Sequence, residues 1–120
     1  MVLLDTNILI YLAKGTLSAD ILTNLTIAHS PIVKIEALGF PEITAQEQQA
    51  LEVILEESHN FTITEPVIEK AIKLKQARKM SLGDAIIAST ALVNDLDLWT
   101  ANTDDFKNIE GLKLHNPLSS

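Results

Sequence analysis

Short apolar runs alternate with segments of helical periodicity along this chain, and the alternation restricts the folds open to it. The first apolar run, residues 2–4, is followed at once by a helical pattern over residues 7–13. Strands separated by helices imply parallel pairing, because a parallel crossover needs about a dozen residues or more. We therefore predict an α/β domain, a three-layer α/β/α sandwich around a central, mostly parallel sheet of about five strands.

The expected elements follow one another without a linker, a repeat or a low-complexity segment. Strands are expected at residues 2–4, 27–29, 61–63, 98–100 and 112–114, and helices at residues 7–13, 16–25, 31–38, 66–78 and 82–94, with one more after residue 44. Ser30 before Pro31 is typical of a helix start, and Thr44 and Glu47 have capping-box spacing. Asn60 is expected in a turn. One domain spanning residues 1–120 is predicted.

Composition sets limits on compartment and on metal chemistry. The chain has no cysteine, which excludes disulfides and thiolate metal sites and fits a reducing compartment. No apolar run approaches the roughly 20 residues that span a bilayer, and no cleavable signal is apparent. A cytoplasmic protein without a membrane partner is expected.

Acidic and amide residues fall where the predicted strands and helices meet. Asp5 directly follows the first strand, at the end of a parallel strand where α/β proteins bind ligands. Glu36, Asp84 and the Asn102/Asp105 pair follow later in the chain. If the fold gathers these groups, their repulsion requires protons or a divalent cation. Oxygen ligands without cysteine or histidine favour Mg²⁺ or Mn²⁺ over zinc.

Each of these residues also has a purely structural explanation. Asp5 can cap the helix that follows it, and Glu36 can occupy the exposed side of an amphipathic helix. Asp84 stands three residues after Ser81, the spacing of a capping box. Asp105 belongs to a turn, where acidic residues are common. The three histidines lack ligand-like spacing and are expected to be structural or on the surface.

The combination of these segments resembles a known family. The segments are LLDTNILIYLA, an isolated glutamate in a helix before position 40, GDAIIASTAL, and WTANTDDF followed by an apolar strand and Asn116-Pro117. Together they resemble the PIN domain, and more narrowly the small toxin ribonucleases of the VapC type. The resemblance covers residues 2–118 in the family's order, and a PIN-like α/β/α fold is what it implies.

The resemblance also implies roles for individual residues. The core metal-binding carboxylates would be Asp5, Glu36 and Asp84, with Asp105, or less readily Asp104, at a fourth acidic position. The supporting residues would be Thr6 and Asn7, which would orient Asp5. Thr100 would support the site by hydrogen bonding, and Asn102 would stand at a polar position of the same loop. Two departures stand out. Gly83 occupies a position where a proline often precedes the family's aspartate, and the chain is short between residues 14 and 27, which affects the substrate wall and partner surface.

The implied activity is a metal-dependent endoribonuclease that hydrolyses RNA phosphodiester bonds with one or two Mg²⁺ or Mn²⁺ ions, leaving 5′-phosphate and 3′-hydroxyl ends. It would be the toxin of a type II toxin–antitoxin pair, a homodimer whose cleft an antitoxin covers. A catalytically silent PIN-like scaffold and a stand-alone RNA-processing nuclease are the alternatives.

Two other α/β classes fit the sequence poorly. A phosphotransfer receiver domain needs an aspartate after the third strand, where this chain has Thr64 and Glu65. A haloacid-dehalogenase-like phosphatase needs a second aspartate two residues after the first, where Asn7 stands.

The charge of the chain is unusual for an RNA-binding protein. The formal net charge is −7, with nine lysines and arginines, whereas proteins that bind nucleic acid usually present a basic face. Five of the nine lie within residues 70–79, either as a solvated helix face or as a local phosphate-facing patch. Lys34 and Lys73 are the residues that we expect to guide the RNA backbone.

Overall fold

A five-stranded sheet, parallel throughout, forms the centre of the protein. The computed structural model describes residues 1–118, so the last two residues of the predicted domain lie outside the described part. The strands have the order β3-β2-β1-β4-β5, and each neighbouring pair is parallel. Their bounds are β1 (Val2–Leu4), β2 (Ile27–His29), β3 (His59–Asn60), β4 (Asp97–Trp99) and β5 (Leu114–His115).

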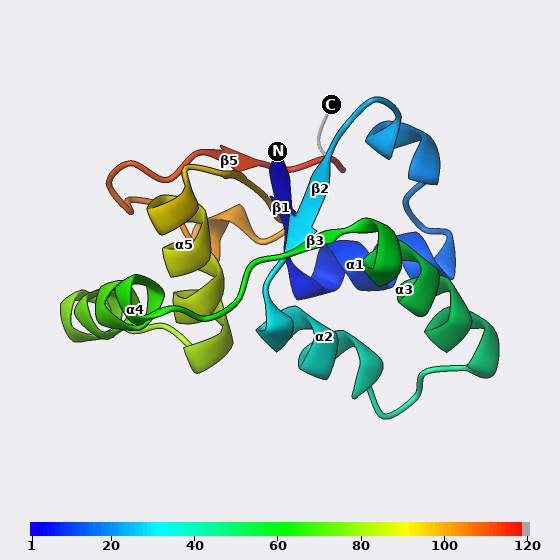
Figure 1. Cartoon of the computed structure of the whole chain (residues 1–120), viewed down its shortest axis with the longest axis horizontal. Helices are drawn as coiled ribbons and strands as arrows, with labels where there is room; N and C mark the ends of the chain where they lie inside the picture. Colours follow the sequence, from blue (N-terminus) through cyan, green and yellow to red (C-terminus); the bar gives the residue numbers. More distant parts are fainter. Residues whose placement is uncertain (119–120) are drawn as a thin grey trace.

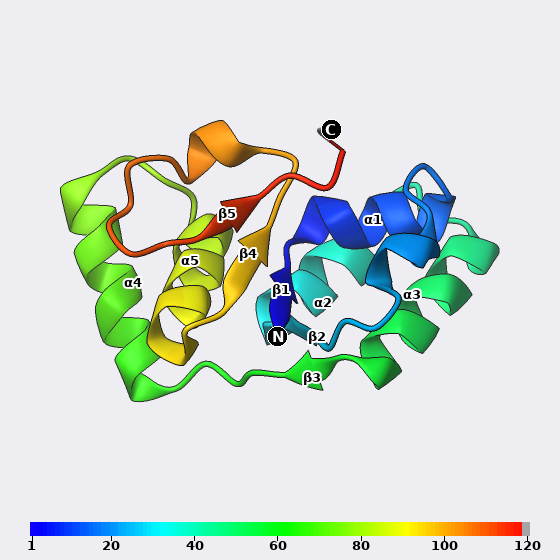
Figure 2. The ribbon, with the colours of Figure 1, turned by 90° about the horizontal axis from the view of Figure 1, so that it is seen from above.

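Helices cover both faces of this sheet. They are α1 (Thr6–Lys14), α2 (Pro31–Leu38), α3 (Ala45–Glu57), α4 (Glu65–Ala77) and α5 (Leu82–Asn94), with two 3-10 segments, η1 (Ala19–Leu22) and η2 (Thr103–Asp105). Figures 1 and 2 show α1, α2 and α3 on one side and α4 with α5 on the other. The predicted three-layer α/β/α fold is therefore confirmed.

The core lies where the central strands meet the helices. All three residues of β1 are buried, as expected for a parallel strand covered on both faces. Leu3 pairs in register with Ala28 on one side and Leu98 on the other. These residues, with Ile8 on α1, are completely buried. The core therefore supports the strand ends from which the polar side chains project.

Residues 16–25, predicted as a helix, form only the short 3-10 segment η1. Ser18 caps that segment, and Asn24 adopts a positive φ of 66° that ends any helical continuation. Leu17 is buried here and Ile21 and Leu22 are half-buried against the core, so η1 packs its apolar side chains without extending into a longer helix.

The third strand lies earlier than predicted. Asn60, expected in a turn, belongs to β3 with His59, and pairing ends when the Phe61 N–H donates to the His29 carbonyl at 2.9 Å. Beyond that point β2 offers no further partner. The ends of β4 and β5 also differ by one or two residues from the prediction, because Thr100 and Lys113 join the ladder only through single backbone hydrogen bonds.

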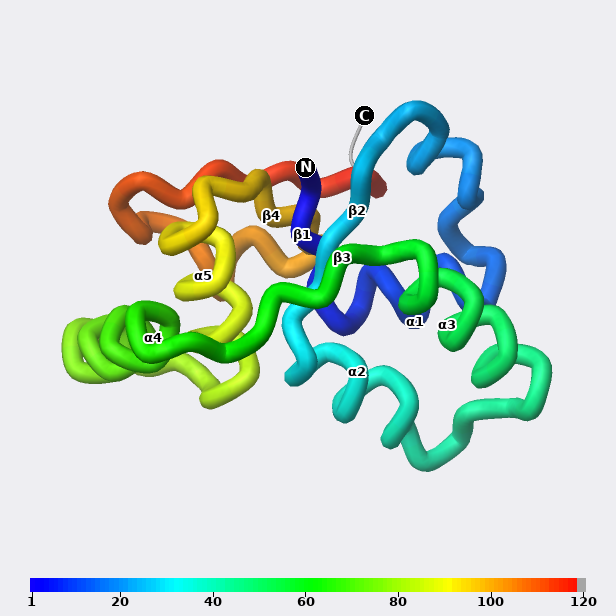
Figure 3. The backbone as a smooth tube through the Cα atoms, viewed as in Figure 1, coloured from blue at the N-terminus to red at the C-terminus, as the bar shows by residue number. Residues whose placement is uncertain are grey.

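The connections create a switch point beside the central strand. The chain goes from β1 to β2 and β3 on one side, then crosses to α4 and α5 before β4 pairs with the other side of β1. Figure 3 shows this crossing after β3. In open α/β sheets ligands bind outside the carboxyl ends of the strands at such a reversal. Here that place lies beyond β1 and β4. None of the helices within residues 1–118 has the length and apolar character needed to cross a membrane.

Candidate functional site

A polar cavity of about 190 Å³ lies beyond the carboxyl ends of β1 and β4, at the switch point of the sheet. Its acidic residues come from four segments: the start of α1, the middle of α2, the first turn of α5, and η2. The fold thus brings together side chains that are far apart in the sequence. The lining residues are Asp5, Thr6, Asn7, Glu36, Asp84, Ile87, Asn102, Asp105 and Phe106.

Asp5 caps a helix and also lines the cavity. Its Oδ1 accepts the N–H of Ile8 at 3.0 Å and so caps α1, while its own N–H donates to the carbonyl of Trp99 at 3.2 Å and extends the β1–β4 pairing. Only 6% of its surface is exposed. Burial raises the pKa of Asp5; hydrogen bonds with Thr100 and Ile8 act against this rise, and the charges of Asp84 and Glu36 add to it.

Asp84 lies in the first turn of α5, and its carboxylate faces the cavity. The Ser81 hydroxyl accepts the Asp84 N–H at 3.1 Å. This one bond is the cap described for α5. It differs from the cap of α3, where the side chain of the third helical residue also accepts a hydrogen bond from the N-cap backbone. Burial raises the pKa of Asp84, the charge of Asp105 raises it further, and Glu36 adds a smaller contribution that a hydrogen bond with Ser81 opposes. The first turn also favours a carboxylate through the helix dipole.

Glu36 reaches the cavity from an exposed position on α2. Its Oε1 accepts the hydroxyl of Thr6 at 2.6 Å. Thr6 was predicted to orient Asp5; its hydroxyl instead holds Glu36, because α1 turns that side chain towards α2. Asn7 and Asn102 also line the cavity. Thr100, completely buried, accepts the Asn102 N–H at 3.0 Å and so shapes the loop after β4.

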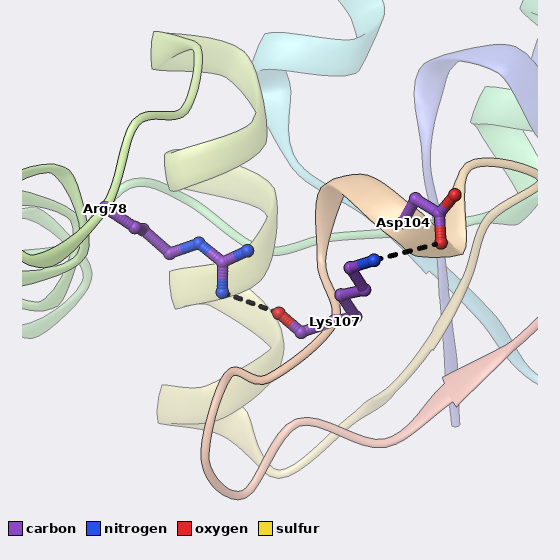
Figure 4. A network of polar contacts seen from close by, with 3 residues as sticks. All are labelled: Arg78, Asp104 and Lys107. Carbon is purple, nitrogen blue, oxygen red and sulfur yellow. Dashed lines mark hydrogen bonds and ion pairs between the residues drawn. The ribbon is translucent and has the colours of Figure 1, made fainter.

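The loop after β4 separates its two neighbouring aspartates. Asp105 lines the cavity, whereas Asp104 is turned outward and lies 3.7 Å from Nζ of Lys107. Arg78, at the end of α4, donates from Nη1 to the carbonyl oxygen of Lys107 at 2.7 Å, as Figure 4 shows. The Nε of Arg78 is buried without a hydrogen-bond partner in the described chain. Arg78 therefore ties the α4–α5 connection to the loop that carries Asp105.

The apolar floor of the cavity did not emerge from the sequence. Ile87 follows Asp84 by three residues on α5, and Phe106 follows Asp105 directly. Both are buried, and Phe106 is among the largest fully buried side chains. For Ile87 the available signal was its spacing from Asp84, since residues three apart lie on one face of a helix; Phe106, adjacent to Asp105, had no such signal.

The lysines predicted to contact RNA lie elsewhere. Lys34 lines a different cavity, of about 470 Å³, together with His29 and Asn60, and Lys73 is exposed on α4. Arg78 and Lys79 are closer to the acidic residues, because they line a cavity of about 210 Å³ whose other lining residues include Asp84, Asp104 and Asp105. The run of basic residues near the end of α4 was the signal for these two.

The donor set has the chemistry that a hard divalent cation requires. Carboxylate and amide oxygens surround the cavity, and two of the carboxyl groups have a pKa raised partly by their acidic neighbours. Within residues 1–118, however, no three acidic or histidine side chains are arranged so that they could hold a metal ion. The cavity therefore has the chemical types of ligand that a hard cation requires. Binding of an ion would require the carboxylates to move closer together.

Comparisons with known proteins agree with this geometry. The PIN domain family model matches residues 2–112. A toxin–antitoxin complex from Klebsiella pneumoniae contains a similar chain, 30% identical, with a TM-score of 0.77 and 98% of each chain covered. Comparison with curated proteins finds no match.

Two further solved structures are similar over nearly their whole length. VapBC-1 from nontypeable Haemophilus influenzae is 27% identical with a TM-score of 0.79, covering 99% of this chain and 100% of that one. VapBC2 from Rickettsia felis, bound to a promoter DNA fragment, is 26% identical with a TM-score of 0.79, covering 97% and 98%. This chain therefore belongs to the PIN domain family, and within it to the VapC-type toxin nucleases.

Proposed function

We propose that this protein is a metal-dependent endoribonuclease that hydrolyses RNA phosphodiester bonds and is the toxin of a type II toxin–antitoxin pair. One observation carries the proposal: Asp5, Glu36, Asp84 and Asp105 come from four separate segments and line one cavity at the switch point of the sheet. Structural needs alone do not explain the gathering of four like charges, since each one raises the cost of ionising the others.

These four carboxylates would hold one or two Mg²⁺ or Mn²⁺ ions. When bound, such an ion supplies charge neutralisation on the phosphate and a lower pKa for an attacking water molecule. The chain's own residues prepare the site. Thr6 holds one oxygen of Glu36, Ile8 holds one oxygen of Asp5, and Ser81 fixes the helix start that presents Asp84. Asn7 and Asn102 offer polar contacts to the substrate, over the apolar floor of Ile87 and Phe106.

RNA binding by this acidic protein requires local basic groups. Lys34 and Lys73 are our original candidates, and Arg78 with Lys79 are favoured by their position beside the carboxylates. Replacing a phosphate contact should weaken RNA binding for all sequences and reduce the dependence of log K on log[salt] by about 1. Charge reversal at Lys79 should do this, and the same change at Lys34 and Lys73 tests the original candidates. An unchanged slope at a residue excludes it.

Partners follow from the relatives. The similar structures from Klebsiella pneumoniae, Haemophilus influenzae and Rickettsia felis are described as toxin–antitoxin or VapBC complexes. We propose a homodimer that acts in the cytoplasm and binds a cognate antitoxin. Two apolar side chains close in sequence to cavity carboxylates are exposed: Ile35, which precedes Glu36, and Leu82, two residues before Asp84. Their exposure supports a protein contact beside the cavity. Co-expression with the product of the neighbouring gene tests for an antitoxin. Light scattering then gives the mass of the protein alone and of the complex, and so tests for the homodimer. If no neighbouring gene encodes a binding partner, a stand-alone RNA-processing nuclease is favoured.

Cleavage of cellular RNA tests the activity. Purified protein is incubated with total RNA and Mg²⁺, Mn²⁺ or EDTA, beside Asp5→Asn and Asp84→Asn, which reveal contaminating nuclease. We expect discrete products that require the metal and are absent with either variant. Equal cleavage by the wild type and both variants would refute the assignment. Absence of both cleavage and Mn²⁺ binding would favour the silent scaffold.

A further inference from the structure

Glu36 is an exposed cavity carboxylate and is carried by α2. One of its oxygens, Oε1, is held by Thr6 at 2.6 Å. The other, Oε2, has no described hydrogen bond within residues 1–118 and lies against the first turn of α5. The residue it meets there is Gly83, which is buried and immediately precedes Asp84.

The contact with Gly83 is possible only because that residue has no side chain. A Cβ atom placed on Gly83 would lie 2.6 Å from Oε2 of Glu36, and 3.2 Å from both Cδ and Oε1. Real Cβ atoms do not approach another atom so closely, so one of the two must move. The Glu36 carboxylate is the end of a flexible side chain on an exposed helix face, whereas Gly83 is fixed in α5. The carboxylate would therefore be the group that moves.

Helix geometry does not require glycine at this position. Among the described glycines a positive φ occurs at Gly15 and Gly111, and not at Gly83. Glycine inside a helix is unfavourable relative to alanine because it loses more backbone entropy on folding. The sequence thus has a residue that weakens α5 and at the same time makes room for a carboxylate from α2.

We infer that Gly83 is a positioning residue of the candidate site: its missing side chain lets the Glu36 carboxylate lie over the start of α5, beside Asp84. This inference rests on the proposed function of the cavity and deepens it. Alanine at position 83 should leave the fold intact and displace the Glu36 carboxylate.

The test compares Gly83→Ala with Gly15→Ala in metal-free protein and then with Mn²⁺. Gly83→Ala should have a Tm equal to or above that of the wild type, together with Mn²⁺ affinity about tenfold to a hundredfold weaker, the usual effect of disturbing groups that orient a ligand. Gly15→Ala should behave in the opposite way. Position 15 has φ 78° and no atom within 4 Å of a new Cβ, so alanine there strains the backbone far from the cavity and should lower the Tm without changing Mn²⁺ affinity.

A double-mutant cycle identifies the group through which Gly83 acts. In a Glu36→Ala background, Gly83→Ala should cause no additional loss of Mn²⁺ affinity, because the carboxylate that it displaces is gone. An equal further loss would contradict the inference. If Gly83→Ala fails to fold, Glu36→Ala should restore folding; failure in both backgrounds would mean that the new Cβ meets something other than Glu36, which also overturns it.

Crystal structures of the wild type and Gly83→Ala supply a readout that does not depend on metal. The inference predicts that the Thr6–Glu36 hydrogen bond is present in the first and broken or shifted in the second. An unmoved carboxylate refutes the inference, whatever the activity of the protein. If the wild type binds no Mn²⁺ but the carboxylate moves as expected, the proposed function fails and the positioning role of Gly83 stands.

Discussion

Asp5 combines a structural role with a charge that destabilises the fold, and two substitutions separate these effects. Asp5→Asn keeps an oxygen that can accept the Ile8 N–H, at 3.0 Å in the native protein, but removes the buried charge. Asp5→Ala removes both. Because asparagine caps a helix as well as aspartate does, Asp5→Asn should retain the cap and Asp5→Ala should lose it.

The cap gives the difference between these two variants a magnitude. Replacing an N-cap residue by alanine costs about 1 kcal/mol, which for a domain of this size corresponds to roughly 4 °C in Tm. This gap between the asparagine and alanine variants should not depend on pH, because neither side chain titrates.

The charge gives the wild type a pH dependence of known sign. Burial is the main reason that the pKa of Asp5 is raised in the folded protein. Protonated Asp5 therefore favours folding relative to the ionised form, and this contribution is complete below the unfolded pKa, about 3.9, and is lost as the pH rises through the higher folded pKa. Metal-free Asp5→Asn should match the wild type at low pH and be more stable at pH 7.

Thermal unfolding followed by circular dichroism between pH 3 and pH 8, in EDTA, measures both effects. Addition of Mn²⁺ should then reverse the order at pH 7, because a ligand at a hundred times its Kd stabilises the protein that binds it by about 2.7 kcal/mol. If metal-free Asp5→Asn is less stable than the wild type at pH 7, the carboxylate is a favourable structural group, and our explanation of its electrostatics is wrong.

Two further substitutions test contacts around the cavity, and a third serves as a control outside it. Thr6→Val removes the hydroxyl that holds Glu36 and should weaken Mn²⁺ binding about tenfold or more, whereas Thr6→Ser should not; equal affinities in calorimetry would contradict this role. Arg78→Gln removes the bond to the carbonyl of Lys107 and should cost about 1 kcal/mol and speed amide hydrogen exchange in η2; unchanged exchange would show that the bond does not order that loop. Thr44→Ala breaks the capping box of α3, a helix that contributes no residue to the cavity, and should also cost about 1 kcal/mol without affecting RNA cleavage; reduced cleavage at equal folded fraction would argue against the assigned site.

Local signals predicted much of the fold. Ser30 before Pro31 indicated the start of α2, and Thr44 with Glu47 indicated α3, where both capping bonds form at 3.1 and 3.0 Å. These interactions join residues within one turn, so the sequence shows them directly. The parallel sheet followed from the lengths of the connections.

Elements that depend on distant partners were harder to predict. β3 occurs where β2 can pair with it, and its residues His59 and Asn60 are exposed and polar, with no apolar alternation. Residues 16–25 are rich in Thr, Ser, Asp and Asn, which favour caps and turns over helix interiors; Ser18 and Asn24 act in this way, so the helix expected there shortens to η1. Only at β3 did a tertiary contact outweigh local preference.

The candidate site also has residues that local signals predicted and contacts between distant residues that they did not. Asp5 and Asp84 stand at a strand end and a helix start, which the sequence shows, and the cavity contains both. The bond between Thr6 and Glu36 joins residues thirty positions apart, and the contact of Glu36 with Gly83 joins two helices. Such contacts depend on the packing of α1, α2 and α5, so the sequence identified these residues but not the partner of Thr6.

The most direct test of the central claim, that these carboxylates form one cation site, is calorimetric titration of metal-free protein with Mn²⁺. Wild type, Asp84→Asn and Glu69→Gln should be compared, since Glu69 is an exposed acidic residue of α4 that does not line the cavity. We predict that the wild type and Glu69→Gln bind Mn²⁺ with the same affinity and that Asp84→Asn loses this binding. Equal binding by all three proteins, or none by the wild type, would contradict the claim.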